Sequence, residues 1–214
     1  MNVLLQLLLV LCVLGMALKL LSLNLWRALL VVAPGGMRLE SEEPEALDER
    51  PSSLAPLVAQ LQALGFVPLG AHREKPRLQA GVRLYDFAHP GERAFASLYA
   101  APRTGHPVLY FLTPLAPDGC VLTLGFKRAV LEGPGRYRSG GFEAASAEQL
   151  LQHHRAQCEG LRSTEDFSPR ARLEVGRAWY QGPGQREIRR QNLQGLLWTL
   201  VALALIAFLF TPRG

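Results

Sequence analysis

The sequence predicts an α+β domain inserted between an N-terminal and a C-terminal transmembrane helix. Apolar residues collect at both ends of the 214-residue chain, in runs long enough to cross a bilayer. Between them lie four short segments rich in β-branched and aromatic residues, separated by turns that contain Pro and Gly. Helical apolar patterns flank these segments. We therefore expect a four- to five-stranded antiparallel meander with flanking helices.

The composition excludes several classes of protein. Hydrophobic residues make up 49% of the chain and charged residues 19%, which argues against both a disordered and a wholly soluble chain. Three cysteines without close spacing do not form a disulfide framework. The net charge is +5, but the arginines are dispersed, apart from a cluster that membrane topology explains. We therefore expect no nucleic-acid partner.

The first apolar segment, residues 3–23, has the length of about 20 residues that a helix needs to cross the hydrocarbon core. Lys19 extends its ammonium to the headgroups, and Trp26 and Arg27 fit the interface. Pro34-Gly35-Gly36 ends the helix. Residues 1–36 are therefore predicted to be a transmembrane helix with an interfacial extension.

A cleaved signal peptide is the alternative for this segment. Against it, no Lys or Arg precedes the apolar run, and the run is longer than the core of a typical signal peptide. A lipoprotein signal centred on Cys12 is weaker still, because bulky Leu11 precedes it and there is no basic n-region.

The second apolar segment, residues 193–210, is interrupted only by Gln194, Gly195 and Thr199. A buried core helix is the alternative, but the segment follows a basic cluster and lies close to the C-terminus. Residues 183–214 are therefore predicted to be a basic juxtamembrane helix followed by a transmembrane helix.

The Lys and Arg residues near the span ends predict the orientation. The side of the central segment carries six arginines, Arg27, Arg38, Arg177, Arg186, Arg189 and Arg190, and the opposite side carries Arg213. We expect an integral protein of the cytoplasmic (inner) membrane with its central domain in the cytoplasm and both termini outside. Free Cys120 and Cys158 agree with a reducing compartment.

The central domain is predicted to begin after an acidic linker, residues 37–51. Six of the ten residues from Glu40 to Glu49 are acidic, which is typical of a solvated tether and also fits a hook for a basic partner. A helix follows, with Ser52 or Ser53 as its cap and Gly65 after its end. Its apolar positions recur at helical spacing: Leu54, Leu57, Val58, Leu61 and Leu64.

Strands are predicted next. Short connections exclude crossover helices, so neighbouring strands should pair antiparallel. The apolar run at residues 108–112 is expected to be central and covered on both faces. The four segments are Val82–Ala88, Ala94–Ala100, Val108–Leu115 and Cys120–Phe126, with Phe66–Gly70 as a possible fifth.

The rest of the domain, which spans residues 52–182, is predicted to hold a loop and two helices. Residues 130–142 read as a Gly-rich loop. Ser146 and Gln149 form a capping box for a helix over Ala147–Cys158. Ser168-Pro169 begins another helix, which ends at residues 182–184.

Histidines are the first candidates for chemistry. His72, His89 and His106 are each seventeen residues apart, which we attribute to strand-plus-turn units of similar length, with His89-Pro90 and His106-Pro107 marking hairpin ends. A zinc site needs three or four converging ligands. His154 and Cys158 share one helix face, and Cys120 would have to complete a site from the sheet.

Other motifs for catalysis or phosphate binding are incomplete. There is no GxSxG elbow and no Cys in a His-paired signature. The loop at residues 133–141 lacks the GK[ST] ending of a phosphate loop, although its Arg136 and Arg138 could attract an anion. We therefore assign no catalytic, cofactor-binding or metal-binding residue and expect no enzyme activity and no cofactor.

The leading hypothesis is a two-span membrane protein that presents a small cytoplasmic α+β domain for binding or assembly, with the bilayer and a protein partner or a second copy as its contacts. One alternative is a membrane-anchored enzyme or metal-dependent module using His153, His154 and Cys158. Another is an exported, C-terminally anchored domain with a cleaved signal. The order of an LxxLGF helix, a meander and a capped helix between two spans resembles bacterial membrane proteins of that layout, and this resemblance implies no activity.

Overall fold

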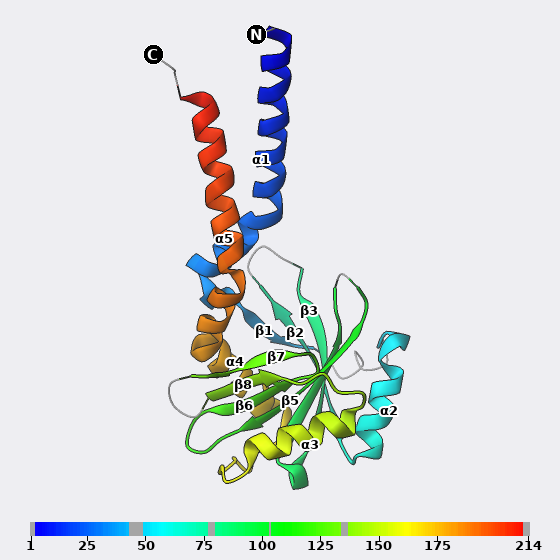
Figure 1. The fold of residues 1–214 in the computed structure, drawn as a ribbon. Helices are drawn as coiled ribbons and strands as arrows, with labels where there is room; N and C mark the ends of the chain where they lie inside the picture. The colour runs from blue at the N-terminus through cyan, green and yellow to red at the C-terminus, as the bar shows by residue number, and fades with distance from the viewer. Residues whose placement is uncertain (1–2, 43–48, 77–79, 103, 134–136, 212–214) are drawn as a thin grey trace. The chain divides into compact units, whose positions relative to one another are not determined.

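The computed structural model describes residues 3–42, 49–76, 80–102, 104–133 and 137–211. These form two compact units. The helical unit contains residues 1–36 and 184–214, and the α+β unit contains residues 37–183. Figure 1 shows the two long helices of the first unit and the sheet and shorter helices of the second.

The helical unit consists of α1 (Val3–Val32) and α5 (Pro183–Phe210). Both are long and apolar enough to cross a membrane, and most of their large apolar side chains are exposed. A 3-10 turn at Pro34–Gly36 follows α1, where the sequence predicts its end. The second helix begins at Pro183, because proline has a favourable φ for the first position of a helix.

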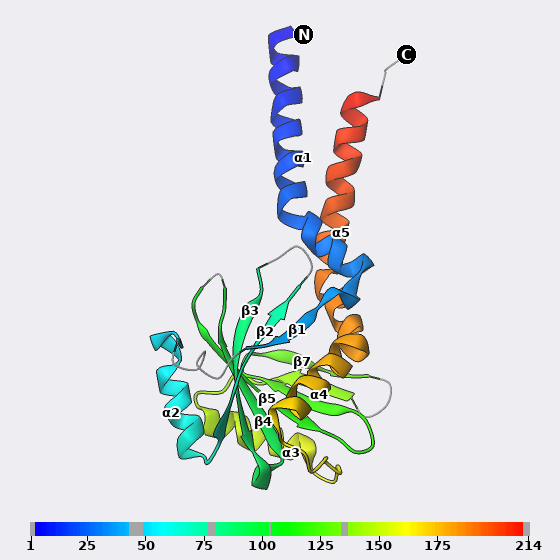
Figure 2. The ribbon, with the colours of Figure 1, turned by 180° about the vertical axis from the view of Figure 1, so that it is seen from behind.

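The two long helices touch near Arg27. Its Nη2 donates a hydrogen bond to the carbonyl oxygen of Gln191 at 3.2 Å. Gly195 makes this approach possible, since a Cβ at that position would lie 2.3 Å from the Cβ of Arg27. Figures 1 and 2 show the two helices side by side and antiparallel, with both extending from this region toward the same end.

Polar side chains buried in the helical unit bond to their own helices. Asn24 Nδ2 donates to the carbonyl of Leu20, and Thr199 Oγ1 donates to that of Gly195. Such bonds to carbonyls one turn earlier satisfy a polar group without any partner from water.

The sheet of the α+β unit has eight strands in the order β1-β2-β3-β4-β5-β6-β8-β7. All neighbours pair antiparallel except β6 and β8, which are parallel. The predicted antiparallel meander of four to five strands is therefore corrected to a mixed sheet of eight strands. The strands are β1 (Arg38–Ser41), β2 (Val67–Lys75), β3 (Val82–His89), β4 (Ala94–Ala100), β5 (Pro107–Pro114), β6 (Cys120–Leu124), β7 (Arg128–Glu132) and β8 (Tyr137–Gly141).

One additional strand lies in the predicted acidic linker. Arg38–Ser41 pairs with the second half of β2, which is itself longer than expected. Glu42, next in the chain, forms ion pairs with Arg73 on β2 and Arg83 on β3. These arginines explain why an acidic segment joins the sheet. Residues 43–48 of the predicted linker lie outside the described residues.

Two more strands lie in the predicted Gly-rich loop. The chain reverses after β6, runs back as β7, and returns as β8 in the space between them. Glycine permits this insertion, because a Cβ on Gly141 would lie 2.0 Å from the carbonyl oxygen of Phe126. Here glycine allows close packing of backbones and does not mark a loop.

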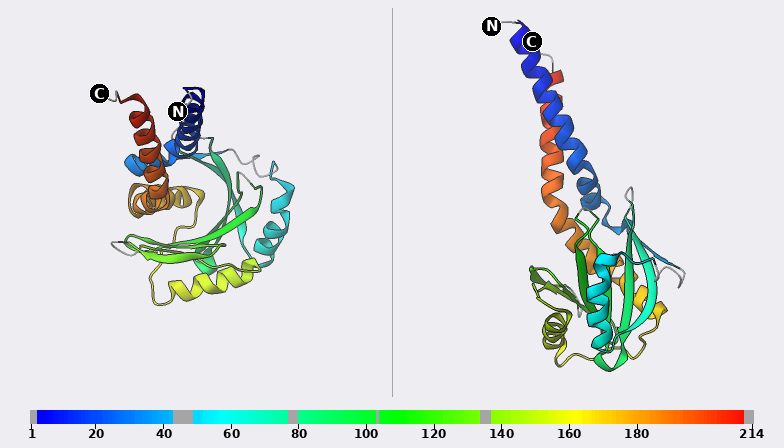
Figure 3. Two further views of the ribbon diagram at one scale, coloured as in Figure 1. Left: turned by 45° about the horizontal axis from the view of Figure 1, so that its top comes forward. Right: turned by 90° about the vertical axis from the view of Figure 1, so that its right-hand side faces the viewer.

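Helices cover both faces of the curved sheet. α2 (Ala55–Ala63) and α3 (Ala147–Cys158) pack on one face, and α4 (Pro169–Gln181) packs on the other. The left view of Figure 3 shows α4 inside the curve of the sheet, with α2 and α3 outside it. The run at residues 108–112 is covered on both faces as predicted: Leu109 and Phe111 join the first core, and Tyr110 and Leu112 the second.

Helix caps follow the sequence at two of the three predicted sites. Ser146 and Ser168 each accept a hydrogen bond from a backbone N–H in the first turn of α3 and α4. Ser52 does not cap α2; a 3-10 turn over Ser52–Leu54 precedes that helix, and no side chain caps it. Gly65 follows α2 at a φ of +88°, as predicted for a residue just beyond a helix.

Candidate functional site

Five polar side chains meet under α4, on the inner face of the curved sheet. Consecutive residues of a strand point to opposite faces, so residues at alternate positions of one strand share a face. The set, which we call the α4 network, takes one residue from each of β2, β3, β4, β5 and α4: His72, Asp86, Ser97, Tyr110 and Arg172.

Asp86 and Ser97 are the centre of the α4 network. His72 Nδ1 donates to one carboxylate oxygen of Asp86 at 2.5 Å, and Ser97 Oγ donates to the other at 2.5 Å. Ser97 Oγ in turn accepts from Arg172 Nε at 3.1 Å and Nη2 at 3.0 Å. The same Nη2 donates to Tyr110 Oη at 2.6 Å. Each charged group is therefore paired without contact with solvent.

The charged groups of the α4 network shift one another's pKa values. Burial alone would raise the pKa of Asp86, but the charge of Arg172 and the hydrogen bond from His72 outweigh it and hold the pKa below 3.8. Burial alone would lower the pKa of His72, but the hydrogen bonds to Asp86 and Glu74 raise it above 6.5. The side chains of His72 and Asp86 are only 1% and 5% exposed, so their proton is held in the interior.

A second contact ties α4 to the sheet. Tyr180 Oη, near the end of α4, donates to Glu74 Oε2 on β2 at 2.6 Å. The other oxygen of Glu74 lies 3.5 Å from Nε2 of His72, so this contact is continuous with the α4 network. Burial raises the pKa of Tyr180, with the charge of Glu74 adding to the effect, so the phenol remains a donor.

The arrangement can orient α4 and hold one proton, and its hydroxyl groups, on Ser97 and Tyr110, are buried and hydrogen-bonded. Removing a charged member leaves its partner buried and unpaired, which costs about 3–5 kcal/mol. The α4 network is therefore a charge-dependent attachment of α4 to the sheet.

A separate pocket of about 340 Å³ lies on the opposite face of the sheet, beside α3. Its lining includes the predicted candidates His154 and Cys158, together with Thr113 and Ser163. The Ser163 hydroxyl is buried and makes no hydrogen bond within the described part of the chain.

His154 is neutral, and its tautomer follows from its neighbours. Thr113 Oγ1 donates to the carbonyl of Arg93 at 2.9 Å, so it accepts from His154 Nε2 at 2.9 Å. His154 Nδ1 then accepts from Thr123 Oγ1 at 2.8 Å. Burial lowers the pKa of His154 to about 3, and neighbouring His153 adds to the effect.

Cys158 and His154 do not form an activated pair. The two atoms Sγ and Nε2 are 3.7 Å apart, but the nitrogen already carries a proton donated to Thr113. Burial raises the pKa of the Cys158 thiol, whereas a reactive cysteine needs a lowered one.

The structure does not bring the other suggested ligands to this pair. His153 stacks on Phe142 at 4.5 Å and accepts a hydrogen bond from Gln157. Cys120 belongs to the core against α4, on the other face of β6 from Thr123, and burial raises its pKa to about 12. Among the described residues, no three His, Cys, Asp or Glu side chains are placed to hold a metal ion.

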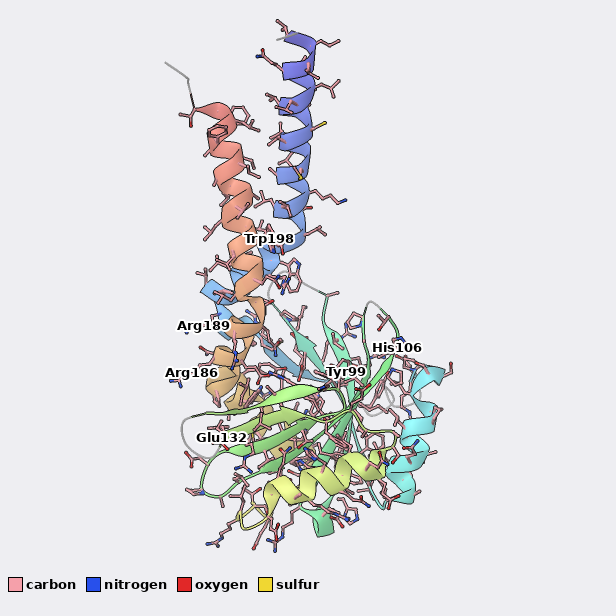
Figure 4. All side chains as sticks on the ribbon, viewed as in Figure 1. Tyr99, His106, Glu132, Arg186, Arg189 and Trp198 are labelled. Carbon is pink, nitrogen blue, oxygen red and sulfur yellow. The ribbon has the colours of Figure 1, made fainter. Side chains whose placement is uncertain are left out.

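The remaining candidates lie apart from one another. His89 Nδ1 accepts from the backbone of Glu92 at the start of a 3-10 turn, and exposed His106 lies at the hairpin between β4 and β5 (Figure 4). Arg138 lies on β8 and pairs with Glu132. Arg136 lies outside the described residues.

No motif in the sequence predicts the α4 network. A signal was present: Asp86 shares a strand face with Leu84 and Ala88, and these apolar neighbours place its carboxylate on a buried face. Such a carboxylate requires a partner, but nothing local in the sequence connects it to Arg172, 86 residues later.

Comparisons with known proteins found no relative of this chain. No family model, curated protein or solved structure matches the chain.

Proposed function

We propose that this chain is a two-span membrane protein whose α+β unit is a cytoplasmic module for binding or assembly. The observation that carries the proposal is the pair of long helices, α1 and α5, which precede and follow the α+β unit in the chain. Their large apolar side chains are exposed along both helices, which favours lipid as their surroundings over a protein core.

The contacts inside the α+β unit support binding rather than catalysis. The α4 network bonds its charged groups to one another, and His154 uses both ring nitrogens for threonine hydroxyls. These groups are engaged in holding the fold, which favours a function at the surface of the unit. A metal-dependent or cysteine-based activity at His153, His154 and Cys158 draws no support from this geometry.

The distribution of arginines supports a cytoplasmic α+β unit. In α5 the arginines precede the apolar part, and Thr211 follows it. Cytoplasmic flanks of membrane spans are enriched in Lys and Arg, so the end of α5 that joins the α+β unit is the cytoplasmic end.

Cysteine labelling tests this topology. The natural cysteines are poor reporters, since Cys120 is fully buried and Cys12 lies within α1. We suggest single exposed cysteines, His106→Cys in the α+β unit and Thr211→Cys beyond α5, in a chain with Cys12→Ala and Cys158→Ser. A membrane-impermeant maleimide is applied to intact cells and, separately, to permeabilised cells.

We expect Thr211→Cys to be labelled in intact cells and His106→Cys only after permeabilisation. Both variants should stay in the membrane pellet during carbonate extraction. Labelling of His106→Cys in intact cells would reverse the orientation. A mature N-terminus near Gly35 would instead support the exported, C-terminally anchored alternative.

A further inference from the structure

The exposed face of α5 changes abruptly from basic to apolar. Arg186, Arg190, Leu193 and Leu197 follow one another at spacings of three or four residues and therefore share a face. The arginines are exposed, and the leucines are 50% and 57% exposed. The change occurs between Arg190 and Leu193, which is less than one turn, or about 4.5 Å along the helix.

Negative charge is kept away from this face. Glu187 is the only acidic residue of α5, and its side chain is buried and accepts a hydrogen bond from Gln191. All three arginines of α5, by contrast, are exposed. Figure 4 shows Arg186 and Arg189 projecting outward from the helix.

A fourth cation comes from the other long helix at the same level. The hydrogen bond from Arg27 to the carbonyl of Gln191 places its guanidinium near the level of this change, but its stem lies against Gly195, on the opposite side of α5 from Arg186 and Arg190. Gly195 allows the stem of Arg27 to lie against α5, since a side chain there would overlap it. Arg27 thus joins the two long helices, and the exposed cations beside Leu193 are those of α5.

We propose that Arg186, Arg189 and Arg190 form a binding site for the phosphate headgroup of an anionic phospholipid. The inference rests on the membrane insertion proposed above and adds a ligand class to it. Guanidinium groups bind phosphate with paired hydrogen bonds, and exposed leucines beginning one turn away accept the acyl chains of the same molecule. A ligand that needs both the arginines for its phosphate and the leucines for its acyl chains is a lipid and not a free phosphate.

Lipid-dependent quenching of Trp198 fluorescence tests the site. Trp198 is exposed and lies eight residues beyond Arg190, about 12 Å deeper along α5, where bromine atoms on acyl chains reach it. The full chain with Trp26→Phe and Trp179→Phe keeps Trp198 as its one tryptophan. It is reconstituted in phosphatidylcholine with brominated phosphatidylglycerol or, in parallel, brominated phosphatidylcholine.

We expect phosphatidylglycerol to be favoured about fivefold or more over phosphatidylcholine, since each arginine near an anionic surface contributes about that factor. The preference should fall to near one in R186Q/R189Q/R190Q and should decrease with added salt. The control R155Q/R170Q, which removes two exposed arginines of the α+β unit, should keep it.

Three results would overturn the inference. Equal quenching by the two lipids in the chain with its natural arginines would overturn the inference. This result does not depend on whether the triple variant folds. A preference that survives in R186Q/R189Q/R190Q would place the ligand elsewhere, and displacement by soluble glycerol phosphate would show a free anion site. Carbonate extraction of each proteoliposome sample separately reports insertion, so its failure would count against the proposed function instead.

Discussion

Arg172 carries the charge that lets Asp86 remain ionised inside the α+β unit. Its guanidinium is 2% exposed and lies 3.2 Å from the Asp86 carboxylate, while its plane passes over the ring of Tyr110. A single arginine thereby connects α4 to three neighbouring strands through Asp86, Ser97 and Tyr110.

We predict that Arg172→Met strongly destabilises the full chain in detergent. The substitution keeps the aliphatic volume but leaves Asp86 with only His72 and Ser97, which should cost about 3–5 kcal/mol of unfolding free energy. Urea unfolding followed by the fluorescence of Trp179 on α4 measures the change. Arg170→Met is the matched control on the same helix; it removes a solvent-exposed pair with Glu174 and should leave the unfolding free energy nearly unchanged. Equal effects of the two substitutions would contradict the role of the α4 network.

His72 should make stability depend on pH. Its pKa in the folded protein is above the unfolded value of 6.5, so folding favours the protonated form. The stabilisation is complete below pH 6.5 and is lost as the pH rises through the folded pKa. We expect the difference in unfolding free energy between the natural chain and His72→Asn to be largest on the acidic side of this range and to shrink on the basic side. Thermal unfolding at a series of pH values above 3.8, where Asp86 stays ionised, measures it. A pH-independent difference would show that His72 is neutral in the folded protein.

Among the elements, β7 and β8 depart furthest from local sequence signals. They occupy a segment rich in glycine, and β8 pairs in parallel with β6 after a connection that contains a whole strand.

The two edges of the sheet differ. α4 covers β1, where Arg177 donates a hydrogen bond to the carbonyl of Leu39. The opposite edge, β7, carries exposed Ala129 and Val130 at a register shift. Irregular pairing of this kind protects an edge from further strand addition.

Gly141→Ala should disrupt the insertion of β8. A Cβ at this position would lie 2.0 Å from a backbone oxygen, so the backbone of Phe126 must move, and we expect a loss of about 3 kcal/mol of unfolding free energy or more. Gly140→Ala is the control, since its Cβ would lie 3.0 Å from a methyl group of Val130 that can rotate away. Urea unfolding of both variants gives the comparison. A Gly141→Ala variant as stable as Gly140→Ala would show that β8 does not pack against the turn after β6.

The two units of the molecule are joined by short connections. Only Gly182 separates the end of α4 at Gln181 from the start of α5 at Pro183. On the other side, residues 33–37 connect α1 to β1, and they include the 3-10 turn at Pro34–Gly36. The segment expected to tether the first span to the domain thus begins with β1, which is part of the sheet. Because these connections are short, we expect α1 and α5 to behave as one helical hairpin in both the topology and the lipid experiments.

Local chemistry in the sequence determined the two apolar helices, the covered run at residues 108–112, the serine caps of α3 and α4, and the four strands bounded by Pro and Gly. Each depends on neighbours within about one turn or on a repeat of two or 3.6 residues, which the sequence displays directly. The prediction of an α+β unit followed from these features alone.

Only the tertiary structure decided the number of strands, the parallel pairing of β6 with β8, and the α4 network. β1 forms because arginines on β2 and β3 hold Glu42, and β8 fits because Gly141 meets the backbone of a distant turn. Likewise, Asp86 and Arg172 are compatible with burial only together. Each of these depends on groups that folding brings together from far apart in the chain, where the energy of a contact and not a local propensity determines the structure.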